Sequence, residues 1–393
     1  MSAPYLFTSE SVTAGHPDKL CDQVSDAVVD AYLAQDPAAR VISEAAVSGG
    51  VMFLAARTRS GATLDLAEIA RGVIADAGYS EGGFNARDCT VMLSQYSLSA
   101  GRAPNLLVAE LDDAALDSVS ASQPATLFGY ACDQTPTRMP LPISLAHALA
   151  RALDDGIAQG RLPGLDPDAK VQAGVEYVDN RPRRLHSVTL LTTQRASDQP
   201  QPLQLREMLL REVLPALDGQ PLQADADTRI HVNPEGVVVG GGPVLHAGLT
   251  GRKNAIDTYG EYARHSGAAL SGKDPLRIDR VGAYAARHAA VQVVAAGLAP
   301  RCEVQLSYVV GQARPASLQV QTGGSGIVDD AEIGRRLLEV LDFRPAAIVR
   351  RFDLQNPQAH REGLFRRLAV FGQVGRSDMD LPWDRADAAQ SIA

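Results

Sequence analysis

The feature of this sequence that most restricts its fold is a repeated pairing of apolar runs across turn residues. Two such runs lie between positions 40 and 59 and are separated by Ser48-Gly49-Gly50, which predicts a β-hairpin. A second hairpin is predicted for 171–177 and 185–193, around Asp179-Asn180. A third is predicted for 302–310 and 316–321. Hairpins of this kind need a further layer to cover one face of the sheet.

Amphipathic helices and shorter strands occupy the segments between the hairpins. Helices are predicted for 64–77, 140–159, 203–217, 281–296 and 331–341, and further strands for 88–95 and 228–232. This order predicts an α+β protein with three similar domains, each a mostly antiparallel sheet covered by helices. The sequence shows no self-similarity, so the threefold prediction rests on element order alone.

Two stretches rich in glycine and proline mark the expected domain boundaries. A chain of 393 residues is too long for one ordinary core, and two or three domains are expected. Gly101-Arg102-Ala103-Pro104 and Gly240-Gly241-Gly242-Pro243 interrupt the pattern. We therefore predict an N-terminal domain over 1–103, a central domain over 104–239 and a C-terminal domain over 240–393.

Charge and cysteine content exclude several classes of protein. The formal net charge is −9, from 37 basic and 46 acidic residues, which argues against a general nucleic-acid binder. The cysteines at 21, 89, 132 and 302 form no CxxC pair and no zinc spacing, so they are expected to be buried thiols of a cytosolic protein. The N-terminus lacks a basic and then apolar leader, and no apolar run approaches the roughly 20 residues of a membrane span. We expect a cytoplasmic enzyme.

A first polar cluster, His16-Pro17-Asp18-Lys19, stands at the start of a predicted helix. The apolar positions after it recur at helical spacing: Leu20, Val24, Ala27, Val28 and Ala31. Proline suits a first helical turn, and the free amides of a helix start favour an anion. The cluster indicates a site for phosphate and its magnesium, although such residues often do no more than cap a helix.

A second cluster lies far along the chain, in Gly248–Lys253 and Gly267–Pro275. The latter nearly matches a phosphate loop, but Asp274 replaces the hydroxyl residue and Pro275 follows too closely for an ordinary helix. We reject the P-loop interpretation. The remaining signal is a glycine-rich backbone beside a group of cations: Arg252, Lys253, Lys273, Arg277 and Arg280. In an acidic protein this favours a polyanionic ligand.

These motifs together resemble the S-adenosylmethionine synthetase family, that is, methionine adenosyltransferases. The segments that carry the resemblance run from about Leu6 to Trp383 and include 7–12, 15–19, 168–170, 249–253, 257–260, 271–274, 283–287 and 302–305. The resemblance implies three similar α+β domains and a homodimer or dimer of dimers with active sites between subunits. It also implies attack of methionine sulfur on C5′ of ATP, release of triphosphate, and its hydrolysis to phosphate and pyrophosphate.

The same resemblance assigns roles to individual residues. His16 would stabilise the leaving oxygen at C5′, and Lys170 and Lys273 complete the expected catalytic set. Asp18 and Asp279 would bind Mg²⁺ and Glu44 would bind K⁺. ATP contacts are expected from Glu10, Lys19, Asp168, Arg252, Lys253 and Arg277. From the residues alone, Glu44 could instead be an edge-strand charge and Asp279 a helix N-cap.

The sequence departs from the family where the family binds methionine and adenine. Arg57 and His246 replace carboxylates that meet the methionine ammonium, and Gln123 replaces the acidic residue of a glycine-rich hexapeptide at 120–125. Ser99 stands for a glutamine, and Val238 for the aromatic residue that stacks on adenine.

Because of these departures, the sequence does not determine which molecule accepts the adenosyl group. A like charge about 4 Å from an ammonium costs about 4 kcal/mol at an effective dielectric constant of 20. The chain could be a synthetase with a remodelled amino-acid pocket, or a related transferase or triphosphatase with a different, non-ammonium acceptor. A non-catalytic relative is the third hypothesis, and the intact triphosphate and metal motifs argue against it.

Overall fold

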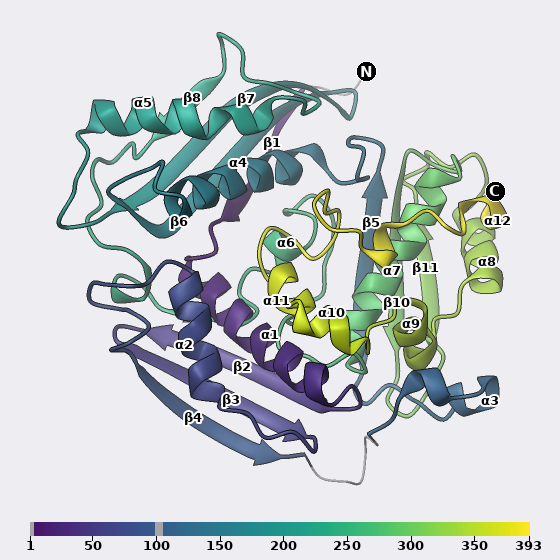
Figure 1. Cartoon of the computed structure of the whole chain (residues 1–393). Helices are drawn as coiled ribbons and strands as arrows, with labels where there is room; N and C mark the ends of the chain where they lie inside the picture. Colours follow the sequence, from purple (N-terminus) through teal and green to yellow (C-terminus); the bar gives the residue numbers. More distant parts are fainter. Residues whose placement is uncertain (1–3, 99–104) are drawn as a thin grey trace.

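The computed structural model describes residues 4–98 and 105–393, and its strands form three sheets (Figure 1). Sheet I has the order β1-β6-β7-β8, sheet II β11-β10-β5, and sheet III β4-β3-β2-β9. The strand bounds are β1 Tyr5–Val12, β2 Arg40–Ser48, β3 Val51–Arg59, β4 Thr90–Ser97, β5 Ala125–Cys132, β6 Leu165–Val178, β7 Arg181–Gln194, β8 Arg229–Val232, β9 Gly248–Leu249, β10 Arg301–Tyr308 and β11 Ser317–Gln321. Neighbouring strands are antiparallel except in the pairs β3–β4 and β7–β8.

Each sheet contains a strand from a distant part of the chain. β1 pairs with β6, so that Thr8 lies opposite Gly174, and β5 pairs with β10. β9 extends sheet III beside β2. Of the two predicted boundary stretches, 101–104 lies outside the described residues and 240–243 lies between β8 and β9.

Helices cover the sheets. α1 (Pro17–Gln35) and α2 (Leu66–Asp76) pack on sheet III, α4 (Leu141–Ala158) on sheet I and α7 (Ile278–Ala295) on sheet II (Figure 1). The remaining helices are α3 Asp113–Leu116, α5 Pro202–Glu212, α6 Asn254–Asp257, α8 Asp330–Val340, α9 Pro345–Arg351, α10 Pro357–Arg361, α11 Leu364–Leu368 and α12 Ala389–Ile392. The prediction of an α+β fold with three helix-covered, mostly antiparallel sheets is confirmed.

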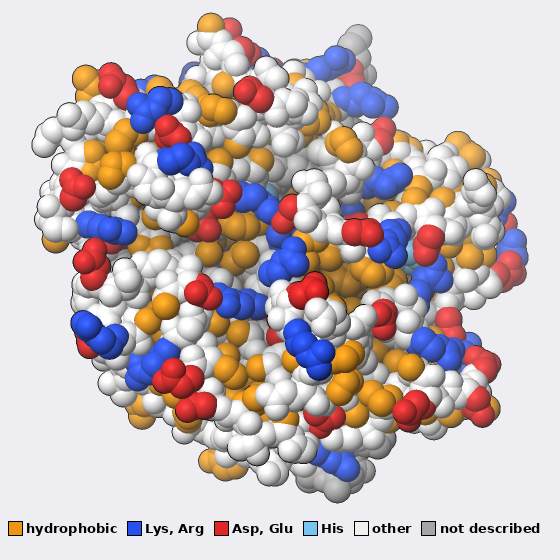
Figure 2. All heavy atoms as spheres, viewed as in Figure 1, with side chains coloured by type: hydrophobic (Ala, Val, Ile, Leu, Met, Phe, Trp, Pro, Cys, Tyr) orange, Lys and Arg blue, Asp and Glu red, His pale blue; other side chains and the backbone are white. Residues whose placement is uncertain are grey.

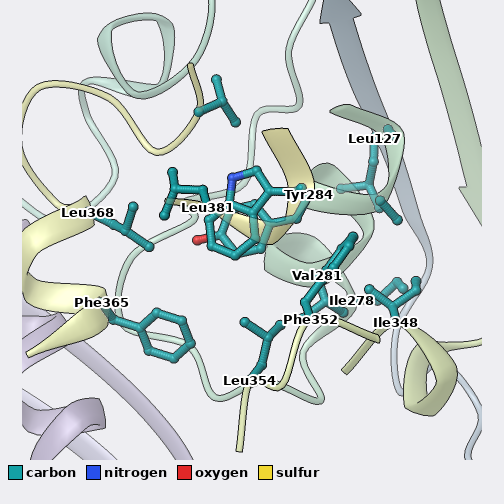
Figure 3. Close-up of a cluster of buried hydrophobic side chains, with 14 of the residues drawn as sticks. Leu127, Ile278, Val281, Tyr284, Ile348, Phe352, Leu354, Phe365, Leu368 and Leu381 are labelled. Carbon is teal, nitrogen blue, oxygen red and sulfur yellow. The ribbon is translucent and has the colours of Figure 1, made fainter. Parts of the chain in front are cut away.

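The core beside α7 is built from aromatic and branched side chains (Figure 3). Tyr284 stacks on Trp383 with ring centroids 4.0 Å apart, and Phe352 meets the same indole edge-on. The indole Nε1 donates to the carbonyl of Gln373 at 2.9 Å, so a fully buried polar group is satisfied. This core ties the C-terminal helices to α7 and so holds α10 and α11 against α1.

Two predicted helices differ from the structure by three residues or more at one end. The helix predicted for 203–217 stops at Glu212, and a 3₁₀ turn over Leu214–Leu217 follows, because Pro215 cannot donate a backbone hydrogen bond. α7 begins three residues earlier than predicted, and its N-cap is Arg277. Asp279 is therefore inside the first turn, so the N-cap alternative for this residue is wrong.

No described part of the chain covers the second face of sheet III. Phe53, Met92, Tyr96 and Leu249 share this face by strand register, and they are 42%, 53%, 67% and 44% exposed. On the side of the molecule drawn in Figure 2, acidic and basic side chains are interspersed. Among the described residues, none of the helices combines the length and apolar content that crossing a bilayer requires.

Candidate active site

The start of α1 gathers the first group of predicted site residues, cluster 1. His16 is the N-cap, and its Nδ1 accepts a hydrogen bond from the amide of Asp18 at 3.2 Å. Asp18 accepts at Oδ1 from the amide of Leu249 in β9, 3.0 Å away, and at Oδ2 from Nζ of Lys253 at 2.7 Å. Arg252 lies 3.8 Å from Oδ1 of the same carboxylate. Asp18 therefore links the helix start to the loop that carries both cations.

The pKa values in cluster 1 follow from burial and these bonds. Burial raises the pKa of Asp18, but the hydrogen bonds from Lys253 and Leu249 outweigh it and hold that pKa below its ordinary value. Burial lowers the pKa of His16 to about 4. His16 is therefore neutral at pH 7, and because Nδ1 accepts from an amide, the ring proton is on Nε2.

Asp168 and His246 complete cluster 1 from the other side. Oδ2 of Asp168 accepts from the amide of Gly242 and lies 2.9 Å from Nε2 of His246. The rings of His246 and His16 have centroids 5.1 Å apart. The hydrogen bond to Asp168 raises the pKa of His246 above its ordinary value. The imidazoles of His16 and His246 and the carboxylate of Asp168 thus lie together at the N-terminal end of α1.

Lys170 follows Asp168 by two residues in β6, so strand alternation places both side chains on one face of sheet I. Its Nζ lies 2.6 Å from Oε2 of Glu10 in the adjacent strand β1, and its side chain is 35% exposed. The predicted pair of catalytic lysine and ATP-binding glutamate is therefore an ion pair across β1 and β6.

Cluster 2 surrounds the start of α7. Nζ of Lys273 lies 3.0 Å from Oδ2 of Asp279. Gln123 donates to the same oxygen and accepts from Arg277, so it bridges the carboxylate and the guanidinium. Burial lowers the pKa of Lys273, and Asp279 opposes this shift. Among the described residues, no hydrogen bond or ion pair joins cluster 1 to cluster 2.

Other predicted site residues lie apart from both clusters. Glu44 and Arg57 are on the uncovered face of sheet III, opposite Ala55 and Ile42 in the β2–β3 register. Val238 has a partly exposed side chain and accepts from the amide of Gln194 through its carbonyl. Ser99 lies outside the described residues.

Two cations are not where the sequence analysis expected them. Lys19 is fully buried and forms ion pairs with Asp22, 2.9 Å away, and with Asp257. Arg280, taken as one of the cations around a polyanion, is fully buried and paired with Asp26 at 2.6 Å. Both charges are balanced inside the protein, because helical spacing turns Lys19 and Arg280 inward from their neighbours Asp18 and Asp279.

The glycines of the second motif serve the protein's own packing. A Cβ on Gly248 would lie 2.2 Å from the carbonyl carbon of Pro17, so only glycine lets β9 approach α1. Gly272 has φ +76, and a Cβ there would meet the carbonyl oxygen of Ser43 at 1.9 Å. Both glycines therefore allow the backbone to approach α1 and β2 of the same chain closely.

One sequence signal was missed. The chain contains four lysines, at 19, 170, 253 and 273, among 37 basic residues, and each pairs with a carboxylate in or beside the two clusters. All the remaining residues among these 37 are arginines. All four lysines are among the predicted site residues, so the scarcity of lysine alone points to those positions.

Comparison with known proteins identifies the family. Family models for the N-terminal, central and C-terminal domains of S-adenosylmethionine synthetase match residues 4–100, 118–238 and 240–385. A protein of Synechococcus elongatus named S-adenosylmethionine synthase is 42% identical, over 100% of this chain and 98% of its own length. Its namesake from Synechococcus sp. strain CC9311 is 46% identical, over 99% and 96%. The chain belongs to the S-adenosylmethionine synthetase family.

Proposed function

We propose that the chain transfers the adenosyl group of ATP to the sulfur of methionine, which gives S-adenosylmethionine and triphosphate, and then hydrolyses the triphosphate. Family membership supports the reaction. The observation that carries it is the neutral His16 at the start of α1, beside a carboxylate held by two cations, Lys253 and Arg252. Nothing in the comparisons favours a different acceptor.

The chemistry follows from where charge develops. Attack of sulfur on C5′ breaks the bond to the bridging oxygen, which takes the electron pair and becomes negative. His16 carries its proton on Nε2 and can donate a hydrogen bond to that oxygen without being charged. Lys170, Lys253, Arg252, Lys273 and Arg277 would bind the triphosphate oxygens. Fixed donors and cations of this kind stabilise the transition state electrostatically, and Asp168 would orient the ribose through its hydroxyls.

The carboxylates of the two clusters fit Mg²⁺. Asp18 and Asp279 are buried, and each already holds an ammonium nitrogen at 2.7 Å and 3.0 Å, where a cation can also stand. When triphosphate engages the lysines, the same carboxylate oxygens become available to hard divalent cations. Bound Mg²⁺ would neutralise triphosphate oxygens. Glu44 is exposed and has no hydrogen-bond or ion-pair partner among the described residues, which fits a K⁺ ligand completed by other oxygens.

We further propose that the chain is a homodimer, alone or within a dimer of dimers, whose sheet III faces pack on each other. The exposed apolar side chains of this face are a surface that monomers rarely leave uncovered. Glu44 and Arg57 lie on the same face, and a twofold axis can pair such opposite charges between copies. Tyr96→Asp combined with Phe53→Asp should give monomers in sedimentation velocity, whereas the native chain sediments as a dimer or larger.

The test of the activity is direct. Purified protein is incubated with ATP, Mg²⁺ and K⁺, with and without methionine, and the nucleoside and phosphate products are identified by mass spectrometry. S-adenosylmethionine, phosphate and pyrophosphate should form only when methionine is present. Methionine-independent triphosphate release at the same rate would contradict the proposed acceptor.

A further inference from the structure

The side chains of His16, Asp168 and His246 are arranged as ligands of one metal ion. One ligand atom from each lies within 4.8 Å of the other two. His16 and Asp168 are buried, whereas His246 is 40% exposed and can rotate. Three side chains of this type leave further coordination positions open, as in metal centres that also accept water or substrate.

The protein already orients two of the three ligands. The amide of Gly242 donates to Oδ2 of Asp168, and Oγ1 of Thr193 donates to its backbone carbonyl, so the carboxylate is fixed on β6. The backbone of His16 is held at the start of α1, where it is the N-cap residue. Supporting hydrogen bonds of this kind raise metal affinity, because ligands need not be ordered on binding.

Both imidazoles must free a nitrogen to coordinate. His246 releases to solvent the Nε2 proton that it donates to Asp168, and the proton on Nε2 of His16 moves to Nδ1. A protonated Nδ1 of His16 gives up the hydrogen bond that it accepts from the amide of Asp18. Because Nδ1 lies 4.0 Å from Oδ2 of Asp18, a small ring rotation lets it donate to that carboxylate instead. This gives the carboxylate–histidine–metal arrangement that is common in metal sites. The nearest cations, Lys253 and Arg252, are paired with Asp18, which reduces their repulsion of an incoming ion.

We propose that His16, Asp168 and His246 form a binding site for a divalent transition-metal ion of the Zn²⁺ type. Two imidazole nitrogens with one carboxylate select Zn²⁺, Co²⁺ or Ni²⁺ over Mg²⁺, which prefers oxygen ligands. This site is separate in ligand type from the magnesium carboxylates proposed above. An ion bound there takes up Nε2 of His16, so it blocks adenosyl transfer if the proposed function holds.

The test uses Co²⁺ as a visible probe on the native chain after chelator treatment, without ATP or methionine. We expect one equivalent of Co²⁺ to give the intense absorption bands of a low-coordinate nitrogen-ligated site, and Zn²⁺ to abolish them. Excess Mg²⁺ should leave the bands unchanged. Absence of these bands, or displacement by Mg²⁺, would overturn the proposal.

Variants locate the site. His246→Gln keeps an amide that can donate to Asp168 but removes the imidazole nitrogen, and it should weaken Co²⁺ binding by at least about tenfold. The matched control is His265→Gln, because His265 is exposed and its hydrogen-bond partner within the described part of the chain is the adjacent carbonyl of Ser266. Circular dichroism checks that both variants fold. Equal Co²⁺ affinity in native chain and His246→Gln would exclude this site.

A second readout separates the metal site from the proposed reaction. Zn²⁺ should inhibit S-adenosylmethionine formation in excess Mg²⁺, and the inhibition should be relieved by chelator and weakened at least about tenfold in His246→Gln. Co²⁺ bands without any S-adenosylmethionine formation would leave the metal site standing and overturn the proposed function. Formation of S-adenosylmethionine without Co²⁺ bands would support the proposed function and overturn the metal site.

Discussion

Nζ of Lys273 lies 3.0 Å from Oδ2 of Asp279, and Arg277 reaches the same carboxylate only through Gln123. Two cations therefore share one carboxylate. Asp18 in cluster 1 likewise faces two cations, Lys253 and Arg252. Cluster 2 keeps one positive charge beyond what Asp279 balances, which suits a polyanionic ligand such as triphosphate. Cluster 1 contains a second carboxylate, Asp168, so Lys253 and Arg252 face two carboxylates there.

Lys273→Ala should lower turnover by two or more orders of magnitude, because one charge contact to the transition state is lost. The measurement is S-adenosylmethionine formation at saturating ATP and methionine. Arg87→Ala is the control, since Arg87 is 88% exposed and, among the residues that the structure describes, its ion-pair partner is its neighbour Asp88. Unchanged turnover in Lys273→Ala would remove the triphosphate assignment.

His16→Asn should abolish adenosyl transfer and leave hydrolysis of added tripolyphosphate largely intact, because hydrolysis does not involve C5′. Asparagine is also a good N-cap, so α1 keeps its start. The two activities are measured separately, by nucleoside product and by released phosphate. If both fall together, the role of His16 lies in folding or metal binding.

Lys170 should be the first lysine to react with an amine-specific acylating reagent. Its side chain is 35% exposed, against 19% for Lys253, 12% for Lys273 and 1% for Lys19. ATP with Mg²⁺ should protect it if it binds triphosphate. Peptide mass spectrometry gives the extent of labelling with and without ATP. Labelling of Lys170 that ATP leaves unchanged would place this lysine outside the site.

The acceptor pocket can be tested through Arg57 and His246. If their positive charges repel the methionine ammonium, methionine should have a high KM, and analogues that lack the ammonium should be better substrates. Arg57→Glu with His246→Asp should then lower the KM for methionine. Neither single change should suffice if both positions face one ligand.

Saturation of the native enzyme at micromolar methionine would contradict that prediction. The structure already gives His246 another partner, because its Nε2 lies 2.9 Å from Oδ2 of Asp168. Arg57 is on the uncovered face of sheet III, so it can reach the pocket only across the proposed dimer.

Stability should fall as the pH drops from about 6.5 towards 4, in part through His147. Burial lowers the pKa of this side chain to about 3 in the folded chain, while its Nδ1 bonds to Oγ of Ser11. The unfolded chain takes up a proton below its ordinary pKa and the folded chain does not, so acid favours unfolding. His147→Gln should reduce the slope of unfolding free energy against pH by up to about 1.4 kcal/mol per unit. Denaturant titrations at several pH values measure that slope, and an unchanged slope would contradict the assignment.

The sequence by itself determined the local elements and most of the residues of the two clusters, but not how those residues are divided, since Arg252 and Lys253 join Asp18 and not Lys273. The turn at Ser48-Gly49-Gly50 gives the predicted β2–β3 hairpin, and the Asp18 segment begins α1 as expected, because turn and helix signals act over a few residues. Lys253 and Lys273 lie in those clusters, and Lys170 pairs with Glu10 across β1 and β6.

Only the tertiary structure decided which charged side chains remain available to bind a ligand. Lys19 adjoins Asp18 and Arg280 adjoins Asp279, yet both cations are fully buried in ion pairs, because their partners Asp257 and Asp26 come from distant segments. The pairing of β1 with β6 and of β9 with β2 is equally long-range. The meeting of His16, Asp168 and His246 depends on that pairing, since contacts between segments so far apart are set by packing and not by local preference.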